Sequence, residues 1–192
     1  MATEFGTYHL SDNPSMYEPV RTNNFRFYVY DLDNLLIPNE DPNDSDSYTK
    51  NGSEVIEFSV VSFDAPHFSQ DPIDIARGNS TLHYAGKPKF STNTLKINDF
   101  FTADGKSVLM AWQRCSYDVK DDIIPRVANY KRNAVLLEYL PDNTLIRSWE
   151  LKGCWVSGLS EDGYTNESSS KKVVTATITF DRAIPTLNKD AV

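Results

Sequence analysis

The side chains best able to do chemistry are three histidines and two cysteines, and they lie far apart in the sequence. None of His9, His67 and His83 has a second histidine, a cysteine or an aspartate at the spacing of a metal site, so we expect no metal centre. Cys115 and Cys154 could form one disulfide, but two cysteines in 192 residues do not make a disulfide framework. We interpret both as reduced, buried thiols of a protein made in the cytosol.

Three aspartates form an acidic cluster at the end of a predicted helix. Asp118, Asp121 and Asp122 offer oxygen ligands of the kind that Ca²⁺ prefers, but acidic residues past a helix end are more often solvated surface. The sequence holds no G-x-S-x-G, P-loop or G-x-G-x-x-G motif. We therefore predict no catalytic residue, no cofactor and no enzymatic activity.

The net charge of −8 is concentrated in one segment, because no lysine or arginine occurs between Arg26 and Lys50. That interval holds six acidic residues, namely Asp31, Asp33, Glu40, Asp41, Asp44 and Asp46. Tight binding of nucleic acid needs clustered basic residues on the phosphates, and this chain has no basic stripe. The basic pairs at 131–132 and 171–172 are interpreted as solvated residues or ion-pair partners.

Alternation of apolar and polar residues predicts about seven strands, at residues 24–32, 54–63, 80–86, 88–99, 133–140, 145–159 and 171–184. Apolar residues at helical spacing predict one helix at 103–118, capped by Thr102 or Asp104. The expected fold class is therefore mainly β, an antiparallel β-sandwich or barrel with one flanking α-helix. We expect one domain at 24–184, an N-terminal arm at 1–23 and a C-terminal tail at 185–192.

No run of 18 apolar residues is present, so no membrane span is expected. The N-terminus also lacks the basic and apolar regions of a signal peptide.

The last predicted strand has two different faces. Val174, Ala176, Ile178 and Phe180 point one way, and Thr175, Thr177 and Thr179 point the other. The apolar row is expected to pack in the core and the threonine row to face something polar. The other predicted core residues are the tryptophans Trp112, Trp149 and Trp155.

Two long loops are predicted, at 37–53 and 64–79. The first is acidic, and it is either a solvated insertion or a functional loop. The second carries Phe68, Ile73 and Ile75, which are unfavourable in water. We expect these three residues to dock on this subunit or on another.

The order of elements resembles a known family. The residues that carry the likeness are "NNFRFYVY", "EFSVVSFDAP" before a long loop, "LKINDF" before a Trp-bearing helix, and the closing pair "RSWELKGCWVSGLS" and "VVTATITFDRAI". Over about residues 24–184, this pattern resembles tail tube proteins of long-tailed bacteriophages, chiefly the contractile-tail type. The N-terminal arm and the acidic loop 37–53 are longer than a minimal tube subunit needs.

The resemblance implies hexameric rings that stack into a hollow tube, in which each subunit gives about four strands to one lumenal barrel. About twenty-four strands at ~4.8 Å spacing have a circumference of ~115 Å and a diameter of ~37 Å, which is wide enough for a DNA duplex. Within this picture Thr175, Thr177, Thr179 and Glu150 are candidate lumen-facing residues, and Phe68, Ile73 and Ile75 are candidates for contact between rings.

The same resemblance implies the partners and the location. They are other copies of the chain, a sheath, a baseplate and a tape-measure protein, in a virion tail assembled in the host cytoplasm. Genomic DNA would pass through the tube without sequence-specific binding.

Two other functions stay open. One is a tube or ring protein of a phage-related system that injects protein. The other is a monomeric β-sandwich binding module, which predicts tryptophans exposed on one face, for example for sugars.

Overall fold

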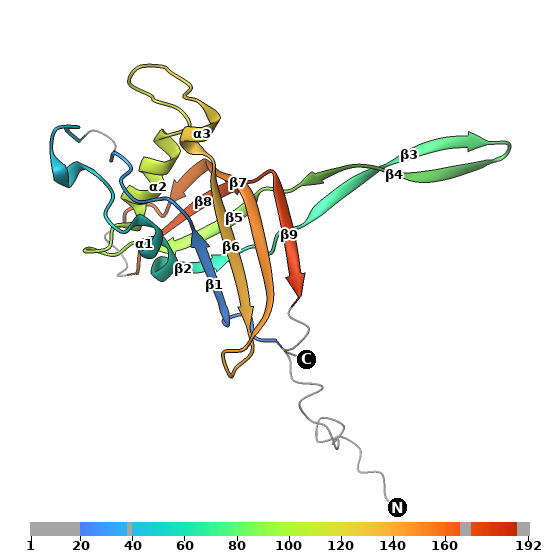
Figure 1. Ribbon diagram of the computed structural model, residues 1–192, viewed down its shortest axis with the longest axis horizontal. Helices are drawn as coiled ribbons and strands as arrows, with labels where there is room; N and C mark the ends of the chain where they lie inside the picture. Colours follow the sequence, from blue (N-terminus) through green and yellow to red (C-terminus); the bar gives the residue numbers. More distant parts are fainter. Residues whose placement is uncertain (1–19, 38–39, 166–169, 188–192) are drawn as a thin grey trace, which may run out of the picture.

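The computed structural model describes residues 20–37, 40–165 and 170–187, and its main body is a bent antiparallel sheet (Figure 1). The strands are β1 (Phe25–Val29), β2 (Val60–Phe63), β3 (Phe68–Arg77), β4 (Ser80–Phe90), β5 (Asn93–Asn98), β6 (Arg132–Tyr139), β7 (Leu145–Glu161), β8 (Val173–Thr179) and β9 (Arg182–Leu187). The helices are α1 (Gly52–Ser59), α2 (Gly105–Arg114) and α3 (Val127–Tyr130), and a short 3-10 helix spans Ser45–Ser47. The predicted mainly β, antiparallel fold class is confirmed.

The long strand β7 holds the sheet together because it pairs with three other strands. Its first part lies between β6 and β9, and its last part pairs with β8. The seven-stranded sheet therefore has two limbs. We call them the β1–β6–β7–β9 limb and the β7–β8–β5–β2 limb, after the strand order in each.

A sharp bend in β7 separates the two limbs. Gly153 has a φ of +69°, a conformation that favours glycine. A Cβ atom at this position would lie 2.3 Å from Oδ2 of Asp181. That carboxylate is fixed in turn by Lys131, whose Nζ lies 2.6 Å away, and the backbone N–H of Asp181 donates to the carbonyl of Lys152. The bend in β7 is thus stabilised by Asp181, which lies between β8 and β9, as well as by the backbone conformation of Gly153.

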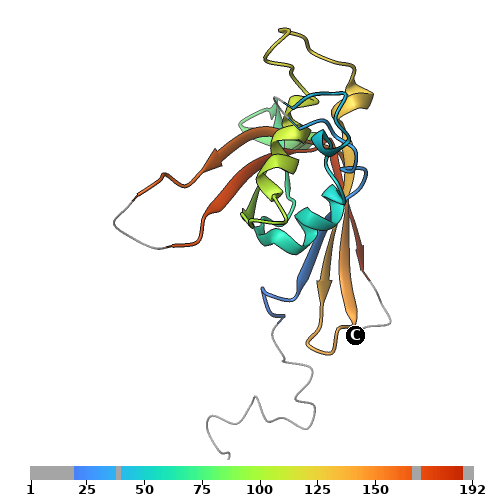
Figure 2. The same cartoon turned by 90° about the vertical axis from the view of Figure 1, so that its left-hand side faces the viewer.

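The core lies on the inner side of this bend, where α1 and α2 pack against each other and against the sheet (Figure 2). Helix α2 buries Val108, Leu109 and Trp112, and the carboxylate of Asp104 caps it by accepting from the N–H of Ser107 at 2.9 Å. The indole N–H of Trp112 donates to the carbonyl of Tyr130 at 2.8 Å. None of the helices in the described part of the chain is long and apolar enough to cross a membrane.

The predicted strand at 54–63 is wrong over most of its length. Residues Gly52–Ser59 form α1, and only Val60–Phe63 are extended. Gly52, Ser53, Ile56 and Ser59 are buried, which is the spacing of one helix face. The helix packs so closely that a Cβ at Gly52 would lie 2.3 Å from the carbonyl oxygen of Leu32. Packing against small residues has therefore overridden the strand propensity of the apolar run.

The predicted loop at 64–79 is also wrong, because most of it is strand β3. This strand pairs with β4 in a hairpin that projects far from the main sheet (Figure 1). Strand β9 continues to Leu187, so extended structure enters the region 185–192 that was expected to be a tail. The arm expected at 1–23 and the rest of that tail lie mostly outside the described residues. The one strand predicted at 171–184 is two strands, β8 and β9, which pair with different parts of β7. The other predicted strands and α2 agree with the prediction within a few residues, and α3 was not predicted.

The bend at Gly153 is a testable support of the fold. Replacing Gly153 with alanine should lower the free energy of unfolding by about 1–2 kcal/mol because of the positive φ, and the new methyl group would also displace the exposed carboxylate of Asp181 from its place beside Lys131. Urea denaturation checks this. Gly163→Ala is the control, because no atom lies within 4 Å of the place that its new methyl group would take and its φ is not positive. Equal stability of the two variants would contradict the proposed role of the bend.

Candidate assembly surfaces

The β3–β4 hairpin has one apolar and one polar face. Ile73 lies opposite Tyr84, and Ile75 lies opposite Leu82, so these four side chains share one face. On the other face the ring of His83 contacts the carboxylate of Asp74, with Nδ1 and Oδ1 2.6 Å apart. Every residue of β3 is exposed, including Ile73 at 54%.

The base of the hairpin is anchored in the core by aromatic contacts. The ring of Phe68 lies 5.8 Å from that of Phe90, which lies 5.9 Å from the buried Phe180. Beyond this anchor the register shifts between Gln70 and Pro72, where a Cβ at Gly86 would lie 2.0 Å from the carbonyl oxygen of Asp71. Two strands alone are marginally stable in water, so a partner covering the apolar face would stabilise the hairpin.

The sequence placed Phe68, Ile73 and Ile75 on one docking loop, but the structure separates them. Phe68 belongs to the anchor, whereas Ile73 and Ile75 belong to the exposed face. Leu82 and Tyr84 on β4 complete that face and were missed. The alternation in "STLHYAG" was a signal for Leu82 and Tyr84, because it places both side chains on one face of a strand. It did not show which strand lies beside them.

The two outer strands of the β1–β6–β7–β9 limb have unpaired edges in the described part of the chain. Such edges are sites where another chain can add a strand. Pro185 lies in β9, which agrees with an edge position because proline cannot donate to a ladder. Strand β2 is the outer strand of the other limb.

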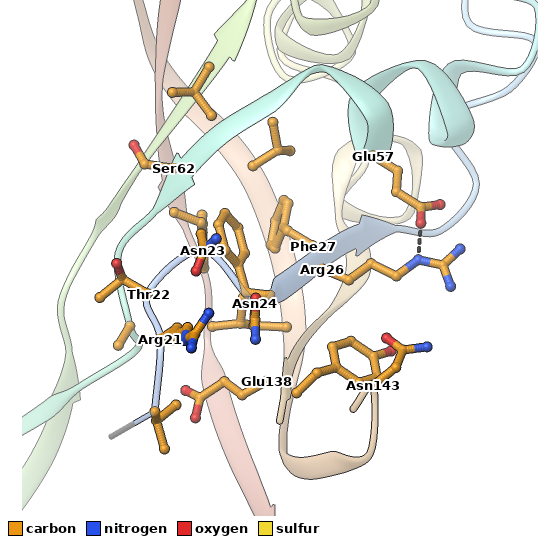
Figure 3. A pocket seen from close by; sticks show the side chains of 18 of the residues that line it. Arg21, Thr22, Asn23, Asn24, Arg26, Phe27, Glu57, Ser62, Glu138 and Asn143 are labelled. Carbon is orange, nitrogen blue, oxygen red and sulfur yellow. Dashed lines mark hydrogen bonds and ion pairs between the residues drawn. The ribbon is translucent and has the colours of Figure 1, made fainter. Parts of the chain in front are cut away.

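A groove of about 1160 Å³ lies beside the free edge of β1, between β1, α1 and β2 (Figure 3). The rings of Phe27 and Phe63 stack 4.1 Å apart and join the two limbs there. An ion pair between Arg26 and Glu57 crosses the same gap. Phe58 is 75% exposed beside it, so this edge is partly apolar.

The candidate lumen-facing residues fall on different limbs. Thr175, Thr177 and Thr179 are half-buried on the outer face of β8, beside β5 and the last part of β7. The hydroxyl of Thr179 donates to that of Ser157 at 2.9 Å. Glu150 lies on the first part of β7, between β6 and β9, and forms an ion pair with Lys152. The structure therefore does not bring the four residues together.

The predicted core residues differ in burial. Trp112 and Phe180 are buried, and Trp149 is half-buried against the core. Trp155 is half-buried on the opposite face of β7, because the bend at Gly153 changes which residues point inward. Its ring contacts Tyr130 at 5.9 Å, edge to face. The three tryptophans do not form one exposed platform of the kind that a sugar-binding module would present.

The cysteines and aspartates that could take part in chemistry lie in environments that make them unreactive. Burial raises the pKa of the Cys154 thiol to about 12, and burial also raises the pKa of Cys115. Both cysteines are free and form no disulfide. Of the three histidines, His9 lies outside the described residues. Asp118 forms an ion pair with Arg114, and Asp122 accepts from the hydroxyl of Tyr117. Within the described ranges, no three His, Cys, Asp or Glu side chains are grouped to hold a metal ion.

One ion-pair cluster joins α2 to the far ends of β7 and β8. Oε2 of Glu161 lies 2.8 Å from Nζ of Lys106 and 2.5 Å from Nζ of Lys172. Lys172 also donates to the hydroxyl of Tyr164 at 2.7 Å. Hydrogen bonds from Lys106 and Lys172 hold the pKa of Glu161 below its ordinary value.

Comparison with solved structures shows which fold this is. A chain in the extended sheath–tube complex of an extracellular contractile injection system (PVC) aligns with a TM-score of 0.61 and 16% identity, over 93% of this chain and 98% of that one. A chain in the tube-terminating cap of the anti-feeding prophage aligns with a TM-score of 0.60 and 15% identity, over 89% and 93%. A chain in the sheath/tube terminator of the PVC system aligns with a TM-score of 0.60 and 16% identity, over 88% of this chain and 97% of that one.

No protein-family model and no curated protein matches the sequence. The structural likeness nevertheless extends over most of the chain. This protein therefore shares its fold with tube and terminator proteins of contractile injection systems, as the resemblance to contractile-tail tube proteins predicted.

The Glu161 cluster predicts a pH dependence of stability. Because the folded-state pKa of Glu161 is lowered, its contribution is present above the ordinary carboxyl pKa of 4.5 and is lost as the pH falls through the folded-state value. Glu161→Gln should therefore lower the melting temperature near pH 7, and its difference from the wild type should shrink below pH ~4. Thermal unfolding at several pH values measures this. A difference that stays constant down to acid pH would contradict the assignment.

Proposed function

We propose that this protein is a structural subunit of the tube of a contractile-tail type particle, and that copies close into rings that stack into a hollow conduit. The observation that carries the proposal is the β1–β6–β7–β9 limb, whose two outer strands have unpaired edges on a chain with the fold of tube proteins. Pairing of one copy's β1 edge with the next copy's β9 edge would remove both edges at once. The proposed role is structural and not catalytic.

The number of strands supports closure around a channel. The limb supplies four strands, so six copies would supply about twenty-four strands and a barrel ~37 Å across at the backbone. If this limb forms the wall, Glu150 faces the lumen and the threonine row of β8 faces a neighbouring subunit. If the other limb forms the wall, these roles are exchanged.

The β3–β4 hairpin is the proposed contact between successive rings. A strand of ten residues is ~34 Å long, so the hairpin reaches well beyond the body of its own subunit. Its apolar face of Ile73, Ile75, Leu82 and Tyr84 is uncovered. Burial of this face on a neighbouring ring would stabilise the stack by the hydrophobic effect.

The cargo is DNA in one form of the proposal and protein in the other. As a phage tail tube, the protein would conduct genomic DNA during ejection, with sheath, baseplate and tape-measure proteins as partners in the virion tail. The similar solved chains come from injection systems, which favours the second candidate, a tube of a phage-related system that injects protein. In either case the lumen needs no sequence-specific contact with the cargo. Clustered lysine and arginine side chains in the lumen would bind the phosphates of DNA and slow its passage.

The decisive experiment is size-exclusion chromatography of the purified full chain with negative-stain microscopy. We expect rings or tubes with a central hole, alone or when assembly is seeded at high concentration. A chain that stays a single compact monomer, with its sheet edges protected from hydrogen exchange, would contradict the proposal. Nuclease-protected DNA in native particles would select the phage-tail form, and its absence from intact, filled particles would select the injection form.

The hairpin gives a sharper prediction. Ile73→Asp with Ile75→Asp should abolish stacking into tubes and leave single rings, because two carboxylates would be buried in the contact between rings. Ala76→Asp with Thr81→Asp is the matched control, since it adds the same charge to the opposite, polar face of the hairpin. Electron microscopy counts rings and tubes. Normal tube yield from the isoleucine variant would show that this face is not the stacking contact.

A further inference from the structure

The two acidic segments of the sequence meet at the C-terminal end of α2, where nothing in the proposed tube makes use of them. Arg114, in the last turn of α2, donates from Nη1 to the carbonyl of Ile37 at 3.5 Å and forms an ion pair with Asp118 at 3.5 Å. It therefore holds the start of segment 37–50 beside the start of segment 117–127. Both segments lie at the same end of the molecule, opposite the C-terminal end of β9 (Figures 1 and 2).

Between the two segments lies a groove of about 800 Å³. It is lined by Glu40, Pro42, Met110, Tyr117, Val119 and Trp155, among others. Beyond it, Ile123 and Ile124 are 55% and 77% exposed. The groove is therefore partly apolar, and the apolar surface continues onto the loop.

The loop that presents these residues is shaped by its own hydrogen bonds. The N–H of Asp118 donates to the carbonyl of Ile123 at 3.0 Å, and the reverse bond measures 3.3 Å. The hydroxyl of Tyr117 donates to the carboxylate of Asp122 at 2.7 Å. The paired residues Asp118 and Ile123 close the loop at its base, and Val119 lies between them in the sequence. Val119 is 79% exposed on this loop.

The lining of the groove holds two acids, Glu40 and Asp118, and two bases, Arg114 and Lys120, but the segments that flank it carry an excess of negative charge. Segment 37–50 and residues 114–127, which run from Arg114 to the end of the second segment, hold seven carboxylates and four basic residues. Two of these four basic side chains are already paired there, Lys50 with Asp46 and Arg114 with Asp118. The C-terminal end of α2 also presents the negative end of its helix dipole.

We propose that this groove binds a basic, amphipathic segment of a different protein chain, with its apolar side on Met110, Val119 and Trp155 and its basic side toward the surrounding carboxylates. A nucleic acid would be repelled by the same charges. A second copy is a poor fit, because this chain has a net charge of −8 and, among the described residues, nine lysines and arginines already form ion pairs. The inference does not depend on ring closure or on the tube.

The test uses the full chain and a fluorescent synthetic peptide of leucine and lysine, about 18 residues long, with leucines at helical spacing. Fluorescence anisotropy at low and high salt measures the dissociation constant. We expect saturable one-to-one binding that weakens with salt. Replacing the leucines with serine should weaken binding about tenfold, because the apolar side is lost.

Three variants locate the site. Glu40→Gln with Asp121→Asn and Asp122→Asn should weaken binding about tenfold, and Val119→Ser with Ile124→Ser should weaken it several-fold. All five side chains are exposed, so these variants are expected to fold. The matched control, Glu54→Gln with Asp71→Asn and Asp74→Asn, removes the same charge elsewhere and should have little effect.

Three results would overturn the proposal. The control could weaken binding as much as the groove variant, which would mean that only the overall charge matters. The serine peptide could bind as well as the leucine peptide. Sedimentation could instead show that the groove variants abolish self-association, which would make the occupant a second copy.

Discussion

The bend in β7 is the constraint on which the rest of this structure depends. A single strand pairs with β6 and β9 before the bend and with β8 after it, so one local change of direction creates both limbs of the sheet. Glycine at position 153 permits the positive φ, and the Lys131–Asp181 ion pair fills the space that a side chain would need. The core, the two helices and the join at Phe27 and Phe63 all lie inside the angle made there.

The fold has unsatisfied surface that the described part of the chain does not cover. The described residues provide no strand for the outer edges of β1 and β9, and nothing covers the apolar face of the hairpin. Backbone edges and exposed apolar ribbons are aggregation hazards in a protein that works alone. They are useful in a protein that works as many copies, because each unsatisfied feature defines one direction of assembly. In the proposed tube, the edges would extend a ring sideways, and the projecting hairpin would connect one ring to the next.

The charged groups are arranged for stability and recognition. The Glu161 cluster ties α2 to the ends of β7 and β8, and the Arg114–Asp118 pair ties α2 to the acidic segments. Both thiols are held in the protonated form by burial. In the two proposals, the surface divides into regions that would bind copies of the same chain and a separate groove, flanked by acidic segments, that would bind a basic chain.

Much of the fold was predictable from local patterns. The alternation in β8 determined that Val174, Ala176 and Ile178 are buried and that its threonines face outward, because successive side chains of a strand point to opposite faces. Helix α2 followed from its apolar spacing and its capping aspartate. The six acids between Arg26 and Lys50 were likewise visible as a charged segment.

Tertiary structure decided the rest. Val55, Ile56 and Phe58 favour a strand, but Gly52–Ser59 form a helix, because close packing on Leu32 outweighs local propensity. The face shared by Ile73, Ile75, Leu82 and Tyr84 depends on cross-strand register, and the groove beside α2 depends on segments about seventy residues apart. A sequence pattern reports the neighbours of a residue along the chain, whereas these surfaces are made by neighbours in space, so only the folded chain could reveal them.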